Sequence, residues 1–416
     1  MKKTIVTLGI LILLNNLSFG QFSKIPPPPP SPKIHILSPN TGIVGQYDLI
    51  EFTAEVPVST QNSINSFFGN NGYGNTYDAS YINPYDPDEI SVEATFSFLN
   101  EPDMVIYGFY YRDFDYSSTP VVINTTWNEN ITLNNHWRVR FTPKHIGNWQ
   151  VKLKVFVNGV LVLLDDIGRN FTCVASNNPG FVKFGANNKY LEYPDGTTIF
   201  PAGTNNPWPD QSLDYDNTTY LPYEYTEHRK RIQKLADGGG NYTRIMFTPY
   251  GYQIEWEKLN NYDMRQNLMW EFDNLIYQAR DNNMLVHISL SQHPEGLTDY
   301  PSNPTYPYSW QYNKYKVDLP TVDNPIDFFT EPDAIDAYKK QIRYIIARWG
   351  YSPQISTFEI MNEAGLLFNY PDVSWDNAMS SWHQEIASYI KTDLNHPMFV
   401  KRICIIKKPN IVLFKL

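Results

Sequence analysis

The pattern of apolar residues changes near residue 177, and this change constrains the fold more than any other feature of the sequence. Over residues 34–176, short β-type runs alternate with clusters of Asn, Gly, Pro and Asp, and helical periodicity is absent. After residue 178, strands alternate with loops and helices through four successive units. We therefore expect an all-β domain followed by an α/β domain with a parallel sheet.

The first twenty residues have the features of a secretory signal peptide. Lys2 and Lys3 precede an apolar run over residues 5–14, and Ser18 and Gly20 supply small residues before a cleavage site. The run is too short to span a bilayer comfortably. We expect residues 1–20 to be removed and the protein to be secreted or periplasmic in a bacterium, with no membrane anchor after cleavage.

Composition narrows the function further. The net charge of −10 and the absence of a long basic run argue against a nucleic-acid partner. The two cysteines of the 416-residue chain exclude a disulfide framework and a cysteine zinc site. Five consecutive prolines within residues 21–33 predict a stiff spacer.

Residues 34–176 are predicted to form an immunoglobulin-like β-sandwich. About seven short strands are expected here, and period-two alternation places Trp137, Val139 and Phe141 on one buried face. The segment over residues 60–88, rich in Asn, Gly and Tyr, is expected to be an extended loop.

Residues 178–400 are predicted to form the N-terminal half of a (β/α)8 TIM barrel, with an open doubly wound sheet as the alternative. The expected strands are 198–202, 242–247, 284–290 and 357–361, with a fifth starting near 397–400, and the expected helices are 223–236, 262–281, one opened by 330–333 and one capped by Ser374. Residues 401–416 form a basic and apolar tail unlike the preceding sequence.

The clearest candidate for a catalytic residue lies at the end of the fourth expected strand, 357–361. Because side chains alternate along a strand, Glu359 and Glu363 share one face, and Glu363 follows the carboxyl end, where barrel active sites are built. A carboxyl group there can protonate a leaving oxygen if burial raises its pKa, and the adjacent Asn362 can hold a sugar hydroxyl. The alternative is a solvated glutamate in a loop.

The Asn362-Glu363 pair resembles the acid/base motif of clan A glycoside hydrolases, such as family 5. The sequence Gly240-Asn241-Tyr242-Thr243-Arg244-Ile245 is similar to the second strand of that clan, and residues 200–205 to its first. His293 stands where the clan often carries a substrate-site histidine. Residues 137–149, with Pro143, Gly147 and Trp149, resemble the immunoglobulin-like domain of unknown function 5060.

The resemblance implies a role for each matching residue. Glu363 would be the general acid/base of a retaining glycoside hydrolase acting on a poly- or oligosaccharide, and Asn362 would bind the sugar. Arg244 would support the catalytic carboxylate, with an ion pair to Glu359 as the alternative. Further substrate-binding candidates are Asn205 and His293, together with the aromatic residues Trp208, Tyr250 and Trp310, for which core positions are the alternative.

Other chemistries lack support in the sequence. His287 and His293 lie near Glu295, but no His-Glu-x-x-His motif or comparable ligand set appears, so neither a metal nor a cofactor is expected. A glycosidase nucleophile is also missing, since beyond Glu363 the only glutamate is Glu385, within a predicted helix.

We expect a C-terminally truncated chain. The rival hypothesis is a non-catalytic carbohydrate-binding or adhesion protein.

Overall fold

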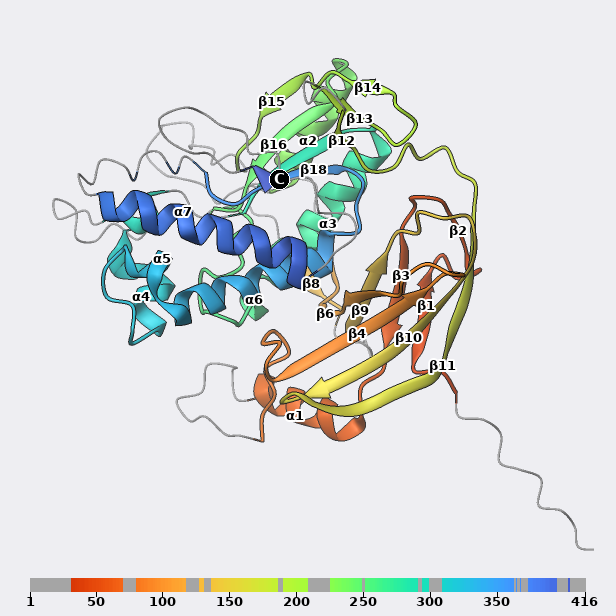
Figure 1. Cartoon of the computed structure of the whole chain (residues 1–416), viewed down its shortest axis with the longest axis horizontal. Coiled ribbons are helices and arrows are strands. Elements are labelled where there is room, and N and C mark those ends of the chain that lie inside the picture. The colour runs from red at the N-terminus through yellow and green to blue at the C-terminus, as the bar shows by residue number, and fades with distance from the viewer. Residues whose placement is uncertain are drawn as a thin grey trace, which may run out of the picture. The chain divides into compact units, whose positions relative to one another are not determined.

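In the computed structural model, residues Pro32–Leu416 form one unit, with antiparallel sheets in its first part and a parallel sheet with helices in its second (Figure 1). The described residues are 31–69, 80–116, 127–130, 136–185, 190–208, 225–248, 251–290, 294–298, 309–362, 364, 367, 373–394 and 403–404. The predicted signal peptide and most of the spacer lie outside them. No helix among these residues is long and apolar enough to cross a membrane.

Two sheets form a β-sandwich in the first part of this unit. One has the order β1-β3-β9-β6 and the other the order β2-β11-β10-β4-β5. All pairings are antiparallel except that of β2 with β11. The strand bounds are β1 Ile34–Ser38, β2 Ile43–Gly45, β3 Ile50–Ala54, β4 Ile90–Ser97, β5 Met104–Tyr107, β6 Phe109–Tyr110, β9 Trp137–Phe141, β10 Gly147–Val157 and β11 Val160–Val174.

Aromatic side chains hold the two sheets together. Strands β3 and β4 alternate between buried and half-buried residues, as a strand packed on one face must. From opposite sheets, Phe96 stacks on Phe141 with ring centroids 4.0 Å apart, and Phe52 meets Phe96 and Phe171 edge to face. The buried face predicted for β9 is thus present, and the described part of residues 34–176 contains eleven strands rather than about seven.

The sandwich departs from the sequence prediction in one helix and one strand face. Helix α1, Val58–Gly69, occupies the start of the expected 60–88 loop, which was therefore wrong in part. In β9, Arg138 and Arg140 are as buried as the apolar residues beside them. Arg140 is covered by α3 (Gln266–Asp281) and α6 (Pro332–Trp349), where it donates to Asp273 and to the Arg348 carbonyl. Alternation alone could not reveal this cover. The remaining strands here are β7 Phe114–Tyr116 and β8 Trp127–Glu129.

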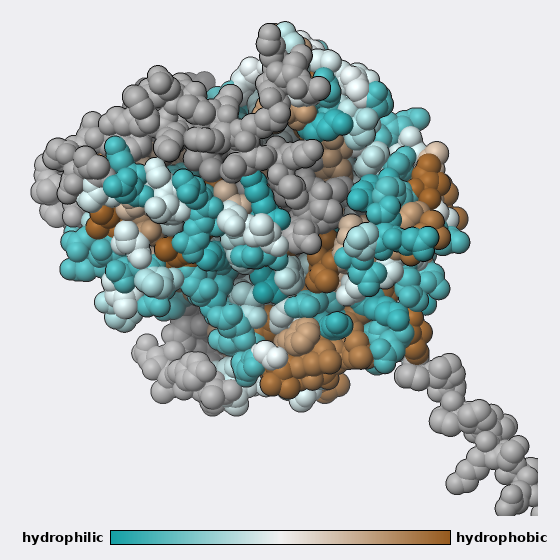
Figure 2. Space-filling model, viewed as in Figure 1, coloured by the Kyte–Doolittle hydropathy of each residue, from teal (hydrophilic) through white to brown (hydrophobic). Residues whose placement is uncertain are grey.

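Apolar residues also reach the surface of the sandwich, as Figure 2 illustrates for one face of the molecule. The hairpin of β10 and β11 turns through Asn158 and Gly159, both with positive φ, which is the two-residue turn that matches strand twist. Exposed residues that follow it on β11 are Val160, Leu161, Val162 and Leu164.

A small antiparallel sheet links the sandwich to the α/β part. It contains β12 Lys183–Phe184, β13 Leu191–Glu192 and β14 Thr198–Ile199. Residues 198–199 belong to this small sheet as β14. The prediction that a strand at 198–202 begins the parallel sheet was therefore wrong. That place is taken by β15, Gly203–Asn205.

The α/β part is a parallel sheet whose strands follow chain order, β15-β16-β17-β18-β19. A doubly wound sheet reverses its strand order at a switch point, so this alternative is excluded for the described strands. The order is that of an arc of a barrel. The bounds are β16 Tyr242–Met246, β17 Leu285–Ser289, β18 Ile355–Glu359 and β19 Ile403–Cys404, the last within the segment set apart as a tail.

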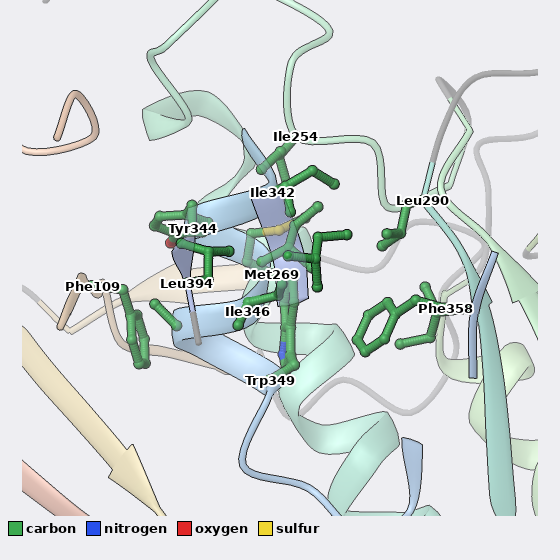
Figure 3. Close-up of a cluster of buried hydrophobic side chains, with 14 of the residues drawn as sticks. Phe109, Ile254, Met269, Leu290, Ile342, Tyr344, Ile346, Trp349, Phe358 and Leu394 are labelled. Carbon is green, nitrogen blue, oxygen red and sulfur yellow. The ribbon is translucent and has the colours of Figure 1, made fainter. Parts of the chain in front are cut away.

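Helices alternate with the parallel strands, as the sequence predicts (Figure 1). They are α2 Tyr225–Asp237, α3 Gln266–Asp281, α4 Lys314–Asp318, α5 Asp327–Thr330, α6 Pro332–Trp349 and α7 Val373–Ser388, with short 3-10 or π turns at 263–265, 294–297, 310–312 and 389–393. Figure 3 shows Trp349 of α6 and Phe358 of β18 in the core between helices and sheet. One face of the sheet is thus apolar and buried.

Candidate functional site

The opposite face of the parallel sheet carries polar side chains. Asn205 on β15, Arg244 on β16 and His287 on β17 are paired in register, so their side chains point to the same side. On β18, Thr357 pairs with His287. Glu359 lies two residues further along β18, so its side chain points to the same side of the sheet. What we call the polar cluster consists of Asn205, Arg244, His287, Glu359 and Asn362, the last just after β18.

Arg244 is the centre of the polar cluster. Its Nε donates a hydrogen bond to Glu359 Oε2 at 2.9 Å, and its Nη2 donates to the same oxygen. Nη2 also donates to Asn362 Oδ1 at 2.7 Å, and Nη1 donates to Asn205 Oδ1 at 3.3 Å. The guanidinium therefore ties three of the five strands together and fixes the orientation of Asn362.

Glu359 is held in its ionised form. Burial alone would raise its pKa, but the hydrogen bond from His287 and the charge of Arg244 outweigh burial and lower the pKa below its ordinary value. His287 Nε2 lies 3.2 Å from Glu359 Oε2, and Tyr242 OH lies 3.1 Å from His287 Nδ1. Because an ionised carboxylate only accepts, the imidazole donates from Nε2, and the phenol supplies the proton at Nδ1 when the ring is neutral.

These interactions define what the polar cluster can do. Glu359 cannot act as a proton donor while it is ionised, and it accepts the two hydrogen bonds that hold the Arg244 guanidinium in place. Asn362 accepts through Oδ1, and its amide nitrogen donates to no other residue among those described. That N–H group is the donor available to a ligand hydroxyl at the carboxyl end of β18.

The structure brings together three of the residues predicted for the site, Asn205, Arg244 and Asn362. The ion pair with Glu359, weighed as the alternative for Arg244, is also present. Glu363, His293 and Tyr250 lie outside the described residues, so their assignments stay predictions.

The two remaining aromatic candidates differ in their surroundings. Trp208 is half-buried just after β15. Trp310 is a core residue, 1 % exposed, with its indole N–H donating to the Asp323 carbonyl at 2.8 Å. Trp310 therefore occupies the core position that was the alternative to sugar stacking, because a buried ring presents no face to a sugar.

Sequence reasoning missed the parts that His287 and Tyr242 play. Both share the strand face of Arg244, and this periodicity could have identified them. His287 had instead been weighed as a metal ligand. No group of three potential metal-binding side chains occurs among the described residues.

A second buried carboxyl group, Glu255, lies in the connection after β16. Burial raises its pKa to about 8, although it accepts hydrogen bonds from Tyr315 and more weakly from Tyr262. The folded protein thus keeps Glu255 protonated where the unfolded chain would release the proton, between about pH 4.5 and 8. Stability is therefore lost as pH rises through this window.

Replacing Glu255 with glutamine is expected to flatten that pH dependence. The amide keeps the shape of the neutral acid, so the stability of Glu255→Gln relative to wild type should rise from pH 5 to pH 8, at about 1.4 kcal/mol per unit of pKa shift removed. Urea unfolding at several pH values measures this, with the exposed Glu101→Gln as control. Parallel pH curves for Glu255→Gln and wild type would contradict the prediction.

Comparison with known proteins matches part of the sandwich. Residues 68–155 match the family model for a domain of unknown function, DUF5060. This confirms the family resemblance stated for this region and leaves its immunoglobulin-like class a prediction. No relative of the chain was found among curated proteins.

Solved structures to which the chain is similar include a candidate glycoside hydrolase from Bacteroides vulgatus ATCC 8482, with 16% identity, a TM-score of 0.45, and coverage of 82% of this chain and 53% of the other. Another is the endo-1,4-β-mannanase of Rhizomucor miehei, with 19% identity, a TM-score of 0.33, and coverage of 51% and 58%. This chain spans a little over half the length of these proteins. Because both TM-scores are below 0.5, a functional assignment depends on the chain's own residues.

Proposed function

We propose that the chain carries the acid/base side of a glycoside hydrolase site, with Glu363 as proton donor and a poly- or oligosaccharide as substrate. The observation that carries the proposal is the hydrogen bond from Arg244 Nη2 to Asn362 Oδ1, 2.7 Å long, at the carboxyl end of a parallel strand. It fixes the residue next to Glu363 at the edge where α/β barrels place their catalytic groups.

The polar cluster suits a sugar substrate. The Asn362 amide would donate to a hydroxyl beside the scissile bond, and Asn205 offers a further amide at the same edge. Glu363 would protonate the glycosidic oxygen as the bond to the anomeric carbon breaks. The sequential parallel strands support a TIM-barrel arrangement around this site.

A retaining mechanism is the form we propose for the reaction. It requires a second carboxylate about 5–5.5 Å from the acid/base to attack the anomeric carbon. Within the described residues, the polar cluster offers only Glu359, whose Oε2 is engaged by Arg244 and His287. We therefore assign no residue as nucleophile.

Saccharide binding and hydrolysis by the whole chain test this proposal. We expect one of a panel of soluble mannan, xylan and β-glucan oligosaccharides to bind, and Arg244→Met to weaken that binding at least tenfold because Asn362 loses its anchor. Arg169→Met, which removes an exposed arginine from β11, is the matched control.

The outcomes separate the two hypotheses. Release of reducing ends that depends on Arg244 supports a hydrolase. Saturable binding without turnover, even by a chain that also supplies the second carboxylate, favours the non-catalytic carbohydrate-binding alternative. Equal binding by Arg244→Met and Arg169→Met would remove the polar cluster from either function.

We also propose that the protein is exported, since residues 1–20 have the features of a signal peptide. Expression of the full chain in a bacterium should yield an extracytoplasmic protein whose first residue is Gln21. Mass spectrometry of the product checks this, and an intact Met1 terminus in the cytoplasm would refute it.

A further inference from the structure

A polar cleft lies at the end of the parallel sheet opposite the polar cluster. It has a volume of about 290 Å³ and is bounded by the starts of β17 and β18, the end of α3 and the segment that leaves the sandwich. Strand β17 has five residues, so about 13 Å of strand separates this cleft from the carboxyl end. The cleft is therefore a separate place on the molecule.

We propose that this cleft binds a neutral saccharide of one or two rings. Its volume is at the lower end of the range of about 300–1,000 Å³ typical of small-ligand sites. A ligand the size of a monosaccharide or disaccharide fits that space. The inference stands apart from the proposed hydrolase activity, since it uses none of the same residues.

The charged groups of the cleft balance and are engaged. Asp48 Oδ1 accepts a hydrogen bond from Asn178 Nδ2 at 3.0 Å. Arg280 donates from Nε to Asp281 at 2.9 Å and lies over the ring of Tyr277. With one acidic and one basic side chain among its lining residues, the cleft has no net charge that would attract an ionic ligand.

Amide and phenol groups remain for the ligand. The side chains of Asn177 and Asn283 make no hydrogen bond to other described residues, and Gln354 uses its Oε1 for Ser352 while its nitrogen donates to none of them. An amide offers both donors and an acceptor, which matches the dual character of a sugar hydroxyl. Tyr193 adds a ring and a hydroxyl at the edge of the cleft.

The wall of the cleft is held in shape before any ligand arrives. Asn178 donates to both Asp48 and the carbonyl of Tyr47, and its Oδ1 accepts from the N–H of Gly180. Gly180 has a φ of +84° and lies against the ring of Tyr47, where a Cβ would approach to 2.8 Å. Such prior ordering lowers the entropic cost of binding.

Calorimetric titration with mannobiose, cellobiose and xylobiose tests the cleft. The titration uses the full chain carrying Arg244→Met, so that the polar cluster is disabled and any remaining site is seen alone. We expect saturable binding of at least one disaccharide, weakened at least tenfold by Asn177→Ala combined with Gln354→Ala. Asn170→Ala, an exposed change on β11, is the control, and thermal melting verifies that each variant is folded.

The outcomes of this titration either support or overturn saccharide binding in the cleft. Tyr193→Phe, which keeps the ring and removes only the hydroxyl, should lie between the parent and the double variant. Absence of binding by all three disaccharides, or binding that the double variant leaves unchanged, would overturn the inference, as would displacement of the sugar by glycylglycine. Binding in the cleft, together with no saccharide binding by the wild-type chain that Arg244→Met weakens, would refute the proposed function and leave this inference standing.

Discussion

Asp273→Ala is expected to lower the free energy of unfolding by about 3–5 kcal/mol, the usual cost of removing one partner from a buried ion pair. Asp273 lies on α3 and accepts hydrogen bonds from Arg348 at 2.7 Å, from Arg140 of the sandwich at 2.7 Å and from the Trp349 indole at 2.7 Å. The two arginines are at most 2 % exposed. The substitution leaves Arg348 buried without a carboxylate partner and leaves Arg140 with Glu51 alone.

The stability that Asp273 contributes through its contacts with Arg140 and Arg348 should also depend on pH. Burial favours the neutral acid, but the two guanidinium groups outweigh it and lower the pKa of Asp273. Its contribution is therefore present at neutral pH and is lost as pH falls through that lowered value. Urea unfolding of Asp273→Ala and of wild type, at neutral and acidic pH, measures both effects.

The matched control is Asp281→Ala, which removes an exposed partner of Arg280 and should change stability by less than about 1 kcal/mol. A loss below about 1 kcal/mol for Asp273→Ala would contradict the account of this interface. Because Arg140 belongs to β9 and Asp273 to α3, the same result tests whether the sandwich and the α/β part unfold together.

In a chain that also carries the second carboxylate, Glu363→Gln is expected to reduce turnover by about 10²–10⁴-fold on saccharides with poor leaving groups, because glutamine cannot donate the proton that the departing oxygen needs. The loss should be much smaller on aryl glycosides, whose leaving groups depart without protonation. The limb of the pH–rate profile that reports loss of the Glu363 proton should disappear as well.

The control for this substitution is Glu385→Gln on α7, where the carboxylate pairs with Lys339 at a half-exposed position away from the sheet. It should leave turnover unchanged. A Glu363→Gln protein with near-normal rates on poor leaving groups would remove Glu363 from the mechanism.

Much of the fold could be predicted because it depends on local periodicity. The expected helix ranges overlap the observed α3 and α6, and the alternation in β9 identified one of the two faces that become buried. Helix α1 was missed because its sequence, rich in Ser and Asn, has weak helix propensity and few buried residues. Residues 198–202 look like a strand in either sheet, since periodicity does not specify a strand's partner.

The polar cluster was predictable only in part. A strand pattern places Arg244 on one face, but which carboxylate it meets depends on the register between strands 115 residues apart. The sequence left Glu359 as an alternative partner for that reason. The burial of Arg140 had the same origin, since contacts between the sandwich and α3 are long-range and leave no periodic signal.

A crystal structure of the full chain with a bound oligosaccharide tests the central claim most directly. The account predicts a sugar hydroxyl within about 3.2 Å of Asn362 Nδ2, with the Glu363 carboxyl group beside a glycosidic oxygen and Arg244 still bonded to Glu359. A saccharide bound only elsewhere, or a Glu363 side chain turned away from the sugar, would contradict it.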